Sequence, residues 1–437
     1  MAEICPFRGI RYNQEIVKDL AQSICPPYDV ITPGQQKYYY ERSSYNAIRL
    51  EYPLPVVTTK QSAHNKYNRA AITLQRWLKE KVLQFEDYPA FYLHDQYFTY
   101  LGKRRRRRGL IVHIKLEPWG NKIYPHEETF PKAKDDRLQL MRACQANFSP
   151  LFALYQDSGD KVAQILTEAS RAEPVIEFAY PEEKHVVWAI TDPAFIRRLS
   201  ELLANQPLYM ADGHHRYETA LAYQQERTHI STSKTPWPIT GKEAFNYVMM
   251  TLVDFSDPGL VILPVHRLVR GIAPSALAQF ESQLKRIFAL KYVPLTENLI
   301  RSLEYKMDGG ALLEILGLVP QSLVLLKQRP DISFEDIMPR NHSLPYKNLS
   351  ISLLNHLILD RMLGITQDSE NVTYTVDIEQ ICQQIKEGKY QLAFLSNSPS
   401  PEIIKTITDA NDRMPRKSTY FHPKLPTGLI MNSLSID

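Results

Sequence analysis

The sequence predicts an α+β protein, a mixed α/β fold with a central mixed sheet, flanking helices and a smaller α/β portion toward the C-terminus. Short apolar runs of strand length alternate with segments of helical periodicity along most of the chain. The best-marked pair is the apolar run Leu208–Asp212, which passes through a tight turn into the helical segment Tyr217–Gln225. No internal repeat or low-complexity tract interrupts this alternation.

The expected helices rest on apolar spacing and on helix-ending residues. Residues Glu15–Ser23 form a short candidate that Pro26 and Pro27 would end, because proline cannot continue a helix. In Tyr67–Val82, apolar residues recur three or four positions apart, as on the buried face of an amphipathic helix. Further helices are expected at Asp135–Ala146, Asp192–Leu203, Tyr217–Gln225 and Ala273–Lys291.

The expected strands follow from alternating or continuously apolar runs. Residues 90–100 and 109–116 alternate apolar and polar positions and predict a β-hairpin. The basic run Lys103–Arg108 falls between them, so we expect a solvated loop at the hairpin tip, with contact to a polyanion as the alternative. Buried strands are expected at Ser149–Tyr155, Val186–Ile190, Phe245–Val253 and Leu260–Pro264.

Soft domain boundaries are expected near residues 270 and 400. Residues 1–270 would form the main α/β domain, residues 271–400 a second α/β domain, and residues 401–437 a basic, proline-containing tail. The aromatic residues Tyr420 and Phe421 favour docking of this tail on the core over disorder.

Composition indicates an ordinary soluble, cytoplasmic protein. The 437 residues carry a net charge of only +4, which argues against nucleic acid as a partner. The four cysteines form no CxxC pair, so neither a zinc ribbon nor a disulfide framework is expected. No apolar stretch is long enough to cross a membrane, and the first residues lack a signal-peptide pattern. The oligomeric state stays open.

The segment Asp212-Gly213-His214-His215-Arg216 is the strongest site candidate. A turn between a strand and a helix presents backbone N–H groups at the positive end of the helix dipole, where anions bind. Gly213 would permit close backbone approach, and Arg216 offers a donor fork suited to phosphate or carboxylate. Asp212, His214 and His215 are candidate catalytic groups. Adjacent histidines point about 100° apart on a helix, so at most one is expected to do chemistry, while the other caps the turn or packs.

Three weaker candidates lie elsewhere. His126 and Glu127 can perform acid–base chemistry or bind a divalent ion, although a surface loop and helix cap would look the same. Asp29 sits on a rigid turn after two prolines, where aspartate also commonly bonds its own backbone. The tail places cationic and hydroxyl groups that would complete an anion pocket, namely Arg413, Arg416, Lys417 and Ser418.

A set of motifs resembles those of a known family. They are Pro6–Gly9, Pro26–Val30, Pro125–Glu127, Ala211–Tyr217, Pro264–Arg267 and Met414–Thr419. Through them the chain, from Pro6 to about Gly428, resembles the prokaryotic domain-of-unknown-function family number ten-fifteen. Asp212–Arg216 is also similar to the signature of the ParB/sulfiredoxin-like superfamily, which includes partition proteins that bind CTP, sulfiredoxin and free-serine kinases.

The second resemblance implies a ParB/sulfiredoxin-like element around residues 205–225. It assigns phosphate binding to Gly213, His214, His215 and Arg216, and it implies serine or phosphoserine as the substrate. The catalytic carboxylate of the kinases has no motif to align here, so Asp29, Glu127 and Asp212 all remain candidates for that role.

The function expected is phosphoryl transfer to or from a small anionic metabolite, by a nucleotide-dependent serine kinase or a phosphoserine phosphatase. ATP or ADP and Mg²⁺ are the expected cofactors, with Glu127 or Asp212 reaching the metal. Walker, protein-kinase, GxSxG and GxGxxG motifs are absent, which excludes the best-known classes of nucleotide-binding proteins and serine hydrolases. The alternatives are a nucleotide-gated ParB-like regulator that contacts DNA through Arg104–Arg108, and a metal-dependent hydrolase using His126, Glu127 and His214.

Overall fold

A computed structural model describes residues 3–54, 62–128, 131–180, 182–204, 206–234, 240–305 and 312–435. They form two compact units. Unit 1 contains the described parts of Met1–Pro125, Thr129–Leu260 and Pro423–Asp437, and unit 2 contains those of His126–Glu128 and Val261–His422. Helices and strands alternate in both units, so the mixed α/β class is confirmed.

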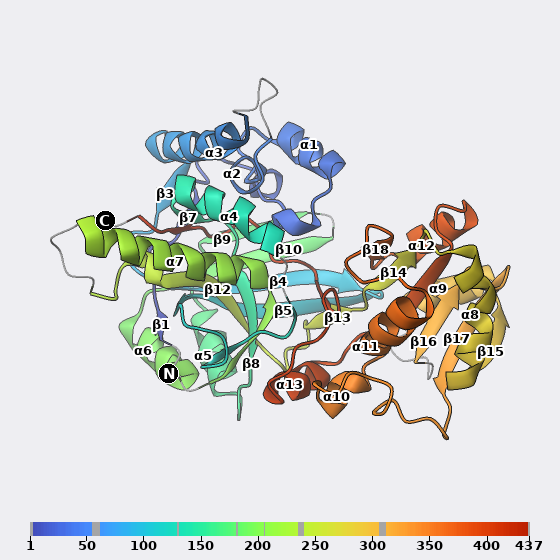
Figure 1. Cartoon of the computed structure of the whole chain (residues 1–437). Coiled ribbons are helices and arrows are strands. Elements are labelled where there is room, and N and C mark those ends of the chain that lie inside the picture. The colour runs from blue at the N-terminus through green and yellow to red at the C-terminus, as the bar shows by residue number, and fades with distance from the viewer. Residues whose placement is uncertain are drawn as a thin grey trace. The chain divides into compact units, whose positions relative to one another are not determined.

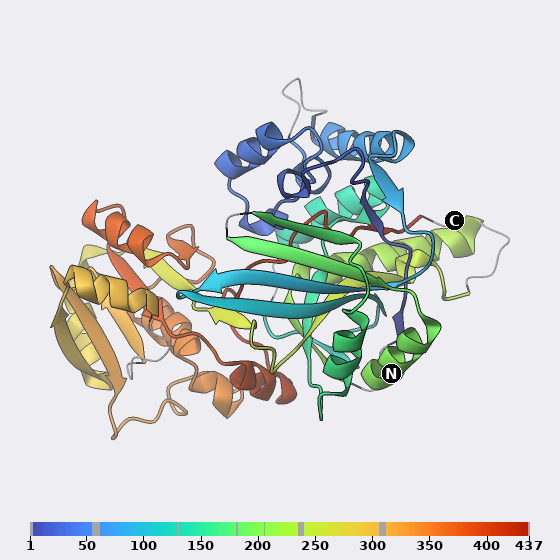
Figure 2. The same cartoon turned by 180° about the vertical axis from the view of Figure 1, so that it is seen from behind.

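Unit 1 is built on a nine-stranded mixed sheet (Figures 1 and 2). Along the sheet the order is β6 (Ile123–Tyr124), β11 (Leu208–Asp212), β8 (Leu151–Tyr155), β12 (Tyr247–Asp254), β5 (Lys103–Lys115), β4 (Phe91–Tyr100), β10 (Glu183–Ile190) and β9 (Ile176–Tyr180), with β1 (Ile4–Cys5) also pairing with β5. The β6–β11 and β8–β12 pairs are parallel and the others antiparallel.

Apolar residues on both faces of this sheet are buried under helices, because successive side chains of a strand point to opposite faces. On one face, Leu110 and Val112 of β5 share a core with α5 (Lys161–Ala169) and α6 (Pro193–Ala204). On the other, Ile111 packs in the core that contains α3 (Ser62–Lys79) and α4 (Pro131–Cys144). The long helix α7 (His214–Lys234) packs along α4, and its buried Tyr217, Ala220 and Tyr223 belong to the first core.

The remaining elements of unit 1 are short. They are η1 (Leu20–Gln22), η2 (Tyr28–Val30), α1 (Pro33–Arg42), α2 (Ile48–Glu51), η3 (Ala244–Asn246), and the strand pairs β2 (Ile10–Tyr12) with β3 (Leu83–Phe85) and β7 (Ala146–Asn147) with β21 (Asn432–Ser433). The β7–β21 pair brings the last described residues of the chain onto unit 1.

Unit 2 contains a six-stranded antiparallel sheet and its own core. Its order is β15 (Phe288–Pro294), β17 (Ser322–Gln328), β16 (Leu313–Leu316), β19 (Leu392–Ser396), β14 (His266–Val269) and β18 (Val372–Thr375), and β13 (Val261–Leu263) pairs separately with β20 (Tyr420–His422). The helices are α8 (Pro274–Ile287), α9 (Glu297–Tyr305), α10 (Leu344–Lys347), α11 (Ser350–Leu353), the π-helix η4 (Leu354–Met362), α12 (Ile378–Lys386) and α13 (Pro401–Asp409).

Three expectations about local structure were wrong. Glu15–Ser23 is no α-helix, because Asp19 is extended and only the 3₁₀ turn η1 follows it. The helix expected over Ala273–Lys291 ends at Ile287, since Phe288–Pro294 pairs with β17 as strand β15. The basic run Lys103–Arg108 is the first half of β5, and the turn of the confirmed hairpin lies at Leu101 and Gly102.

No helix in the part of the chain that the structure describes is both long and apolar enough to span a lipid bilayer.

Candidate functional site

The strand–turn–helix at residues 208–234 is present. Strand β11 ends at Asp212, Gly213 has a φ of +91°, and helix α7 begins at His214. A Cβ atom at position 213 would lie 2.7 Å from Leu151 Cδ2 and 3.0 Å from Arg216 Nη2. Glycine is therefore required both by its backbone angle and by the close approach of these side chains.

Two cations neutralise Asp212 at the end of β11. Its carboxylate accepts hydrogen bonds from Lys424 Nζ at 2.7 Å and from Arg216 Nη2 at 3.0 Å. Burial raises the pKa of this carboxyl, but Lys424 and Arg216 outweigh burial, so its pKa lies below the ordinary value. Asp212 is thus an ionised group that positions two cations.

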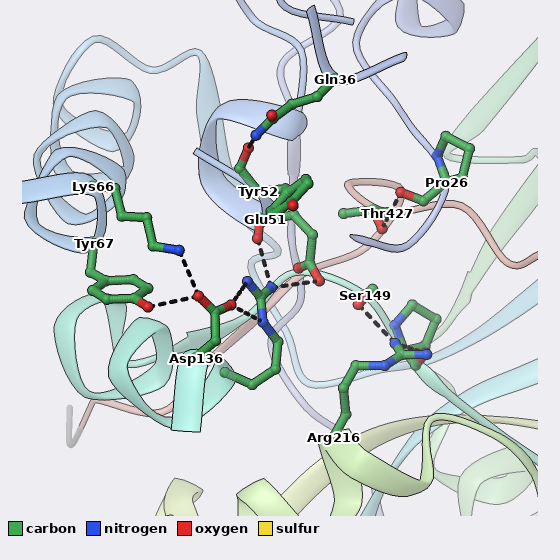
Figure 3. A network of polar contacts seen from close by, with 12 residues as sticks. Pro26, Gln36, Glu51, Tyr52, Lys66, Tyr67, Asp136, Ser149, Arg216 and Thr427 are labelled. Atoms are coloured by element: carbon green, nitrogen blue, oxygen red, sulfur yellow. Dashed lines mark hydrogen bonds and ion pairs between the residues drawn. The ribbon is translucent and has the colours of Figure 1, made fainter. Parts of the chain in front are cut away.

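Arg216 is held firmly in the turn. Its Nη1 donates to Ser149 Oγ (Figure 3) and to the carbonyl of Pro150, both at 2.8 Å, and its Nη2 donates to Asp212. Three acceptors fix the plane of the guanidinium group, so this cation is oriented in advance of any ligand.

A small cavity of about 40 Å³ lies against Arg216. Its lining includes the polar residues Glu51, Arg137, Asn147, Ser149, Arg216 and Thr219. The volume is enough for one or a few waters or for a small polar group. Figure 3 shows Glu51, Ser149 and Arg216 in this neighbourhood, contributed by segments far apart in the sequence.

Glu51 and Arg137 form a buried ion pair beside the cavity. Arg137 Nη1 donates to the Glu51 carbonyl at 2.7 Å and lies 3.4 Å from Glu51 Oε1. Asp136, itself bonded to Lys66 and Tyr67, accepts from the other side of the Arg137 guanidinium. Burial raises the pKa of Glu51 above its ordinary value, although Arg137 and Arg216 act against the rise. A buried carboxyl with a raised pKa is a common feature of acid–base sites.

The two histidines occupy different environments. His214, the first residue of α7, is buried, with its ring 6.2 Å from that of Trp119, and its charge acts on Asp212. His215 is half-buried, and its carbonyl accepts a hydrogen bond from Thr219 at 2.8 Å.

Asp29 lies on the 3₁₀ turn η2, and its side chain is exposed. The ring of the preceding Tyr28 lies under the guanidinium of Arg137 at 4.0 Å, and the negative charge of Asp29 contributes to raising the pKa of Glu51. Asp29 therefore belongs to the electrostatic surroundings of the cavity.

His126 and Glu127 lie in unit 2 with the tail residues. Glu127 accepts hydrogen bonds from the backbone N–H groups of Lys417, Ser418 and Thr419, and His126 Nε2 lies 2.9 Å from Thr419 Oγ1. Lys417 and Ser418 thus act here through their backbone. Arg413 is fixed through its own backbone N–H, which donates to Asp412 at 2.8 Å.

No group of three or more His, Cys, Asp or Glu side chains among the described residues is arranged to hold a metal ion. Both oxygens of Glu127 accept hydrogen bonds from the tail, and both oxygens of Asp212 accept them from cations. The carboxylates of Glu127 and Asp212 are therefore already engaged and do not fit the binding of a resident Mg²⁺ ion.

Two of the basic residues of β5, Arg107 and Arg108, point into the protein, whereas Lys103, Arg104 and Arg106 are exposed. Arg107 is 2 % exposed, donates to Gln96 and to the carbonyl of Pro423, and stacks over Phe152. Arg108 forms two hydrogen bonds with the buried Asp95. The expected solvated loop was therefore wrong, and these two arginines do not form a surface for a polyanion.

Sequence reasoning missed Glu51, Arg137 and Lys424. Lys424 carried a usable signal, because it follows Pro423 and precedes Leu425 in a tail already expected to dock. Glu51 and Arg137 had none, since an isolated acidic or basic residue on a helix is ordinarily a surface group.

A family model described as "Protein of unknown function (DUF1015)" matches residues 4–341. No curated protein matches the chain.

Several solved structures are similar at low identity. A conserved hypothetical protein from Pyrococcus furiosus is 12 % identical, with a TM-score of 0.35, covering 72 % of this chain and 93 % of that one. A free serine kinase variant in complex with ADP is 12 % identical, with a TM-score of 0.36, covering 71 % and 86 %. SbnI from Staphylococcus aureus, truncated at its C-terminus, is 10 % identical, with a TM-score of 0.33, covering 75 % and 90 %.

Proposed function

The chain belongs to the DUF1015 family, and on this premise we propose that it is an enzyme that transfers a phosphoryl group to or from a small anionic metabolite. The site proposed is the turn between β11 and α7 of unit 1, together with the cavity beside it. Within this class, the specific proposal is a nucleotide-dependent serine kinase or a phosphoserine phosphatase.

The observation that carries the proposal is the fixed guanidinium of Arg216 at the first turn of α7. Three acceptors hold this group, and Arg216 itself stands in the first turn of the helix, at the positive end of the helix dipole. Phosphoryl transfer depends mainly on positioning and on stabilising charge at the phosphoryl oxygens. A pre-oriented arginine at a helix N-terminus meets both needs without reorganisation.

Glu51 is the group we assign to proton transfer. Its raised pKa suits a carboxylate that accepts a proton from an attacking hydroxyl, and it lines the same cavity as Arg216. Lys424 neutralises Asp212, so the cluster of Asp212, Lys424 and Arg216 keeps a net positive charge toward an anionic ligand. In the phosphatase direction, His214 or His215 would relay the proton.

ATP or ADP is the phosphoryl carrier proposed for the kinase direction. Mg²⁺ bound to its phosphates would supply charge neutralisation when the nucleotide is present. The residues of the turn do not fit a resident metal, so the roles of Arg216, Lys424 and Glu51 are assigned without it.

The test is direct. The full chain is incubated with Mg²⁺, serine and ATP or ADP, and separately with phosphoserine alone, and the products are followed by ³¹P NMR. Turnover in one of the two mixtures is expected, and its absence from both would contradict the proposal.

Two variants and a control assign the site. Arg216→Lys keeps the charge but loses the planar fork, and we expect at least a hundredfold loss of kcat. Glu51→Gln should lower kcat by a similar factor and remove the acidic limb of the pH profile. Arg142→Ala, which removes an exposed arginine paired with Glu226 on α7, should leave kcat within twofold.

A further inference from the structure

A backbone nest for an anion lies in the tail segment of unit 2. The N–H groups of Lys417, Ser418 and Thr419 all point at the carboxylate of Glu127, at 3.2, 3.1 and 3.0 Å. Thr419 Oγ1 donates a fourth hydrogen bond to the same carboxylate at 2.8 Å. Lys417 has a φ of +56°, the left-handed conformation that turns successive N–H groups toward one point. We call residues 417–419 the tail nest.

His126 completes the hydrogen-bond chain around the nest. The Thr419 hydroxyl has one proton, which it gives to Glu127, so it accepts a hydrogen bond from His126 Nε2 at 2.9 Å. His126 is fully buried, and its carbonyl accepts from the backbone N–H of Met414 at 2.8 Å. The segment that carries Glu127 is thereby tied to the tail at several points.

A buried arginine supplies an independent sign that the nest is built for an anion. Arg267 is fully buried, its Nη2 donates to the carbonyl of Arg416 at 3.2 Å, and its charge interacts with that of Glu127. Its Nε has no hydrogen-bond partner among the described residues. Burying a guanidinium with an unsatisfied N–H group is costly unless an anion compensates it.

A single carboxylate carries little negative charge for the number of donors that surround the tail nest. Three backbone N–H groups, the threonine hydroxyl and Arg267 all favour negative charge, and the exposed Lys417 marks a side of the nest that faces solvent. A phosphate group carries about 1.5 to 2 negative charges and offers more acceptor oxygens than a carboxylate. It would match the donors better than Glu127 does.

We propose that the tail nest is a binding site for a phosphate group, and that Glu127 is its built-in occupant, displaced when the ligand binds. The ligand chemistry is a terminal phosphate, either free phosphate or the phosphate end of a nucleotide. Displacement would break the hydrogen bonds that tie Glu127 to the tail, so occupancy of the nest would be coupled to the position of that segment. The inference is independent of the reaction proposed for unit 1.

The experiment compares two adjacent glutamates. Glu127→Gln removes the competing charge from the nest, whereas Glu128→Gln removes a neighbouring charge that lies 3.8 Å from Arg416 and accepts no bond from the nest. Inorganic phosphate is titrated into each by calorimetry at pH 7.5 and constant ionic strength. We expect Glu127→Gln to bind phosphate at least tenfold more tightly than the unaltered chain, and Glu128→Gln to stay within twofold of it.

The position of the bound phosphate is determined from the backbone amide signals of the tail nest. The chain is labelled with ¹⁵N-lysine and ¹⁵N-serine, and the amide signals of Lys417 and Ser418, assigned through Lys417→Arg and Ser418→Ala, are followed during the titration. Their shift with phosphate supports the proposal. Unchanged affinity in Glu127→Gln, or tighter binding that leaves both signals in place, would overturn it.

Two further variants test the proposal if Glu127→Gln does not fold or if phosphate also binds in unit 1. Glu127→Asp keeps the charge but withdraws it by one methylene, so it should tighten phosphate binding at least threefold even if Glu127→Gln does not fold. Adding Arg216→Ala to Glu127→Gln removes the phosphate grip proposed for unit 1, and the tight binding should persist. ADP in place of phosphate then shows whether the nest prefers a nucleotide or the free ion.

Discussion

The ammonium nitrogen of Lys424 lies 2.7 Å from a carboxylate oxygen of Asp212, although 212 positions separate the two residues in the chain. The contact fixes the C-terminal segment of unit 1 to the end of β11. It also leaves the Asp212 carboxylate shared between Lys424 and Arg216, so the cationic character of the turn depends on a residue far away in sequence.

Loss of Lys424 is expected to weaken unit 1. Lys424→Met leaves the half-buried carboxylate of Asp212 with Arg216 alone, and we expect the free energy of unfolding to fall by about 2–3 kcal/mol. Urea unfolding followed by circular dichroism measures this change. The control is Lys37→Met, which removes an exposed i,i+4 pair with Glu41 and should cost less than ~0.5 kcal/mol. Equal effects of the two variants would contradict the role given to Lys424.

Gly213 should tolerate alanine worse than a glycine of the same backbone angle. Gly213→Ala adds a Cβ that meets Leu151 at 2.7 Å, whereas Gly120 has a φ of +92° and nothing within 4 Å of its would-be Cβ. Both variants carry the cost of left-handed backbone, roughly 1 kcal/mol, and only the first carries the steric cost, on the order of 1–3 kcal/mol more. Thermal unfolding of the pair separates the two terms.

Stability should fall as the pH drops below neutrality because of buried histidine. Burial lowers the pKa of His113 to about 4, and its ring is stacked on Phe7 at 4.2 Å. The unfolded chain binds a proton at this residue below about pH 6.5 while the folded chain does not, so stability is full above pH 6.5 and is lost toward pH 4.

The size of this effect is about 1.4 kcal/mol for each pH unit within that window, at most about 3.5 kcal/mol. His113→Gln should reduce the dependence of the urea midpoint on pH between 6.5 and 4, and the remaining slope comes from His94 and His266, whose pKa values burial also lowers. His229→Gln alters an exposed histidine of the same unit and should leave the slope as it is. An unchanged slope in His113→Gln would show that another group carries the dependence.

Alanine substitutions at two adjacent arginines of β5 should differ sharply in their effect on the free energy of unfolding. Arg107→Ala removes a fully buried guanidinium that donates to Gln96 and Pro423 and stacks over Phe152, and we expect a loss of about 3 kcal/mol. Arg106→Ala alters a side chain that is 43 % exposed and should cost less than ~0.5 kcal/mol. Denaturant unfolding checks both. Salt-sensitive DNA binding that is lost in Arg106→Ala would instead revive a polyanion surface on this strand.

Periodicity predicted the class of the fold and most of its long elements. Tyr67–Val82 and Asp192–Leu203 became α3 and α6 because their apolar faces repeat with helical spacing. It could not separate α8 from β15, since both are apolar at many positions and only pairing with β17 decides between them. It misjudged Arg107 because the pairing of β5 with β4 overrides the general preference of arginine for water.

The turn at Asp212–Arg216 could be predicted from the sequence because its functional side chains follow one another along the chain. Ser149 and Glu51 could not be, since they reach the turn through the packing of distant segments that no local pattern encodes. The docking of the tail that carries Lys424 was expected, but its partner Asp212 was not. His126 and Glu127 were predicted as candidate functional residues, but their actual partners in the tail follow only from the three-dimensional course of the chain.

The division of the chain between the two units has a consequence for biosynthesis. Residues 423–435 belong to unit 1 and supply its buried Ile430, Met431 and Leu434, while the whole of Val261–His422 is translated before them. Unit 2 has all its strands once His422 has left the ribosome, whereas unit 1 must wait, incomplete, through some 160 residues of synthesis for its last strand. The part of the protein made first is thus the part that finishes folding last.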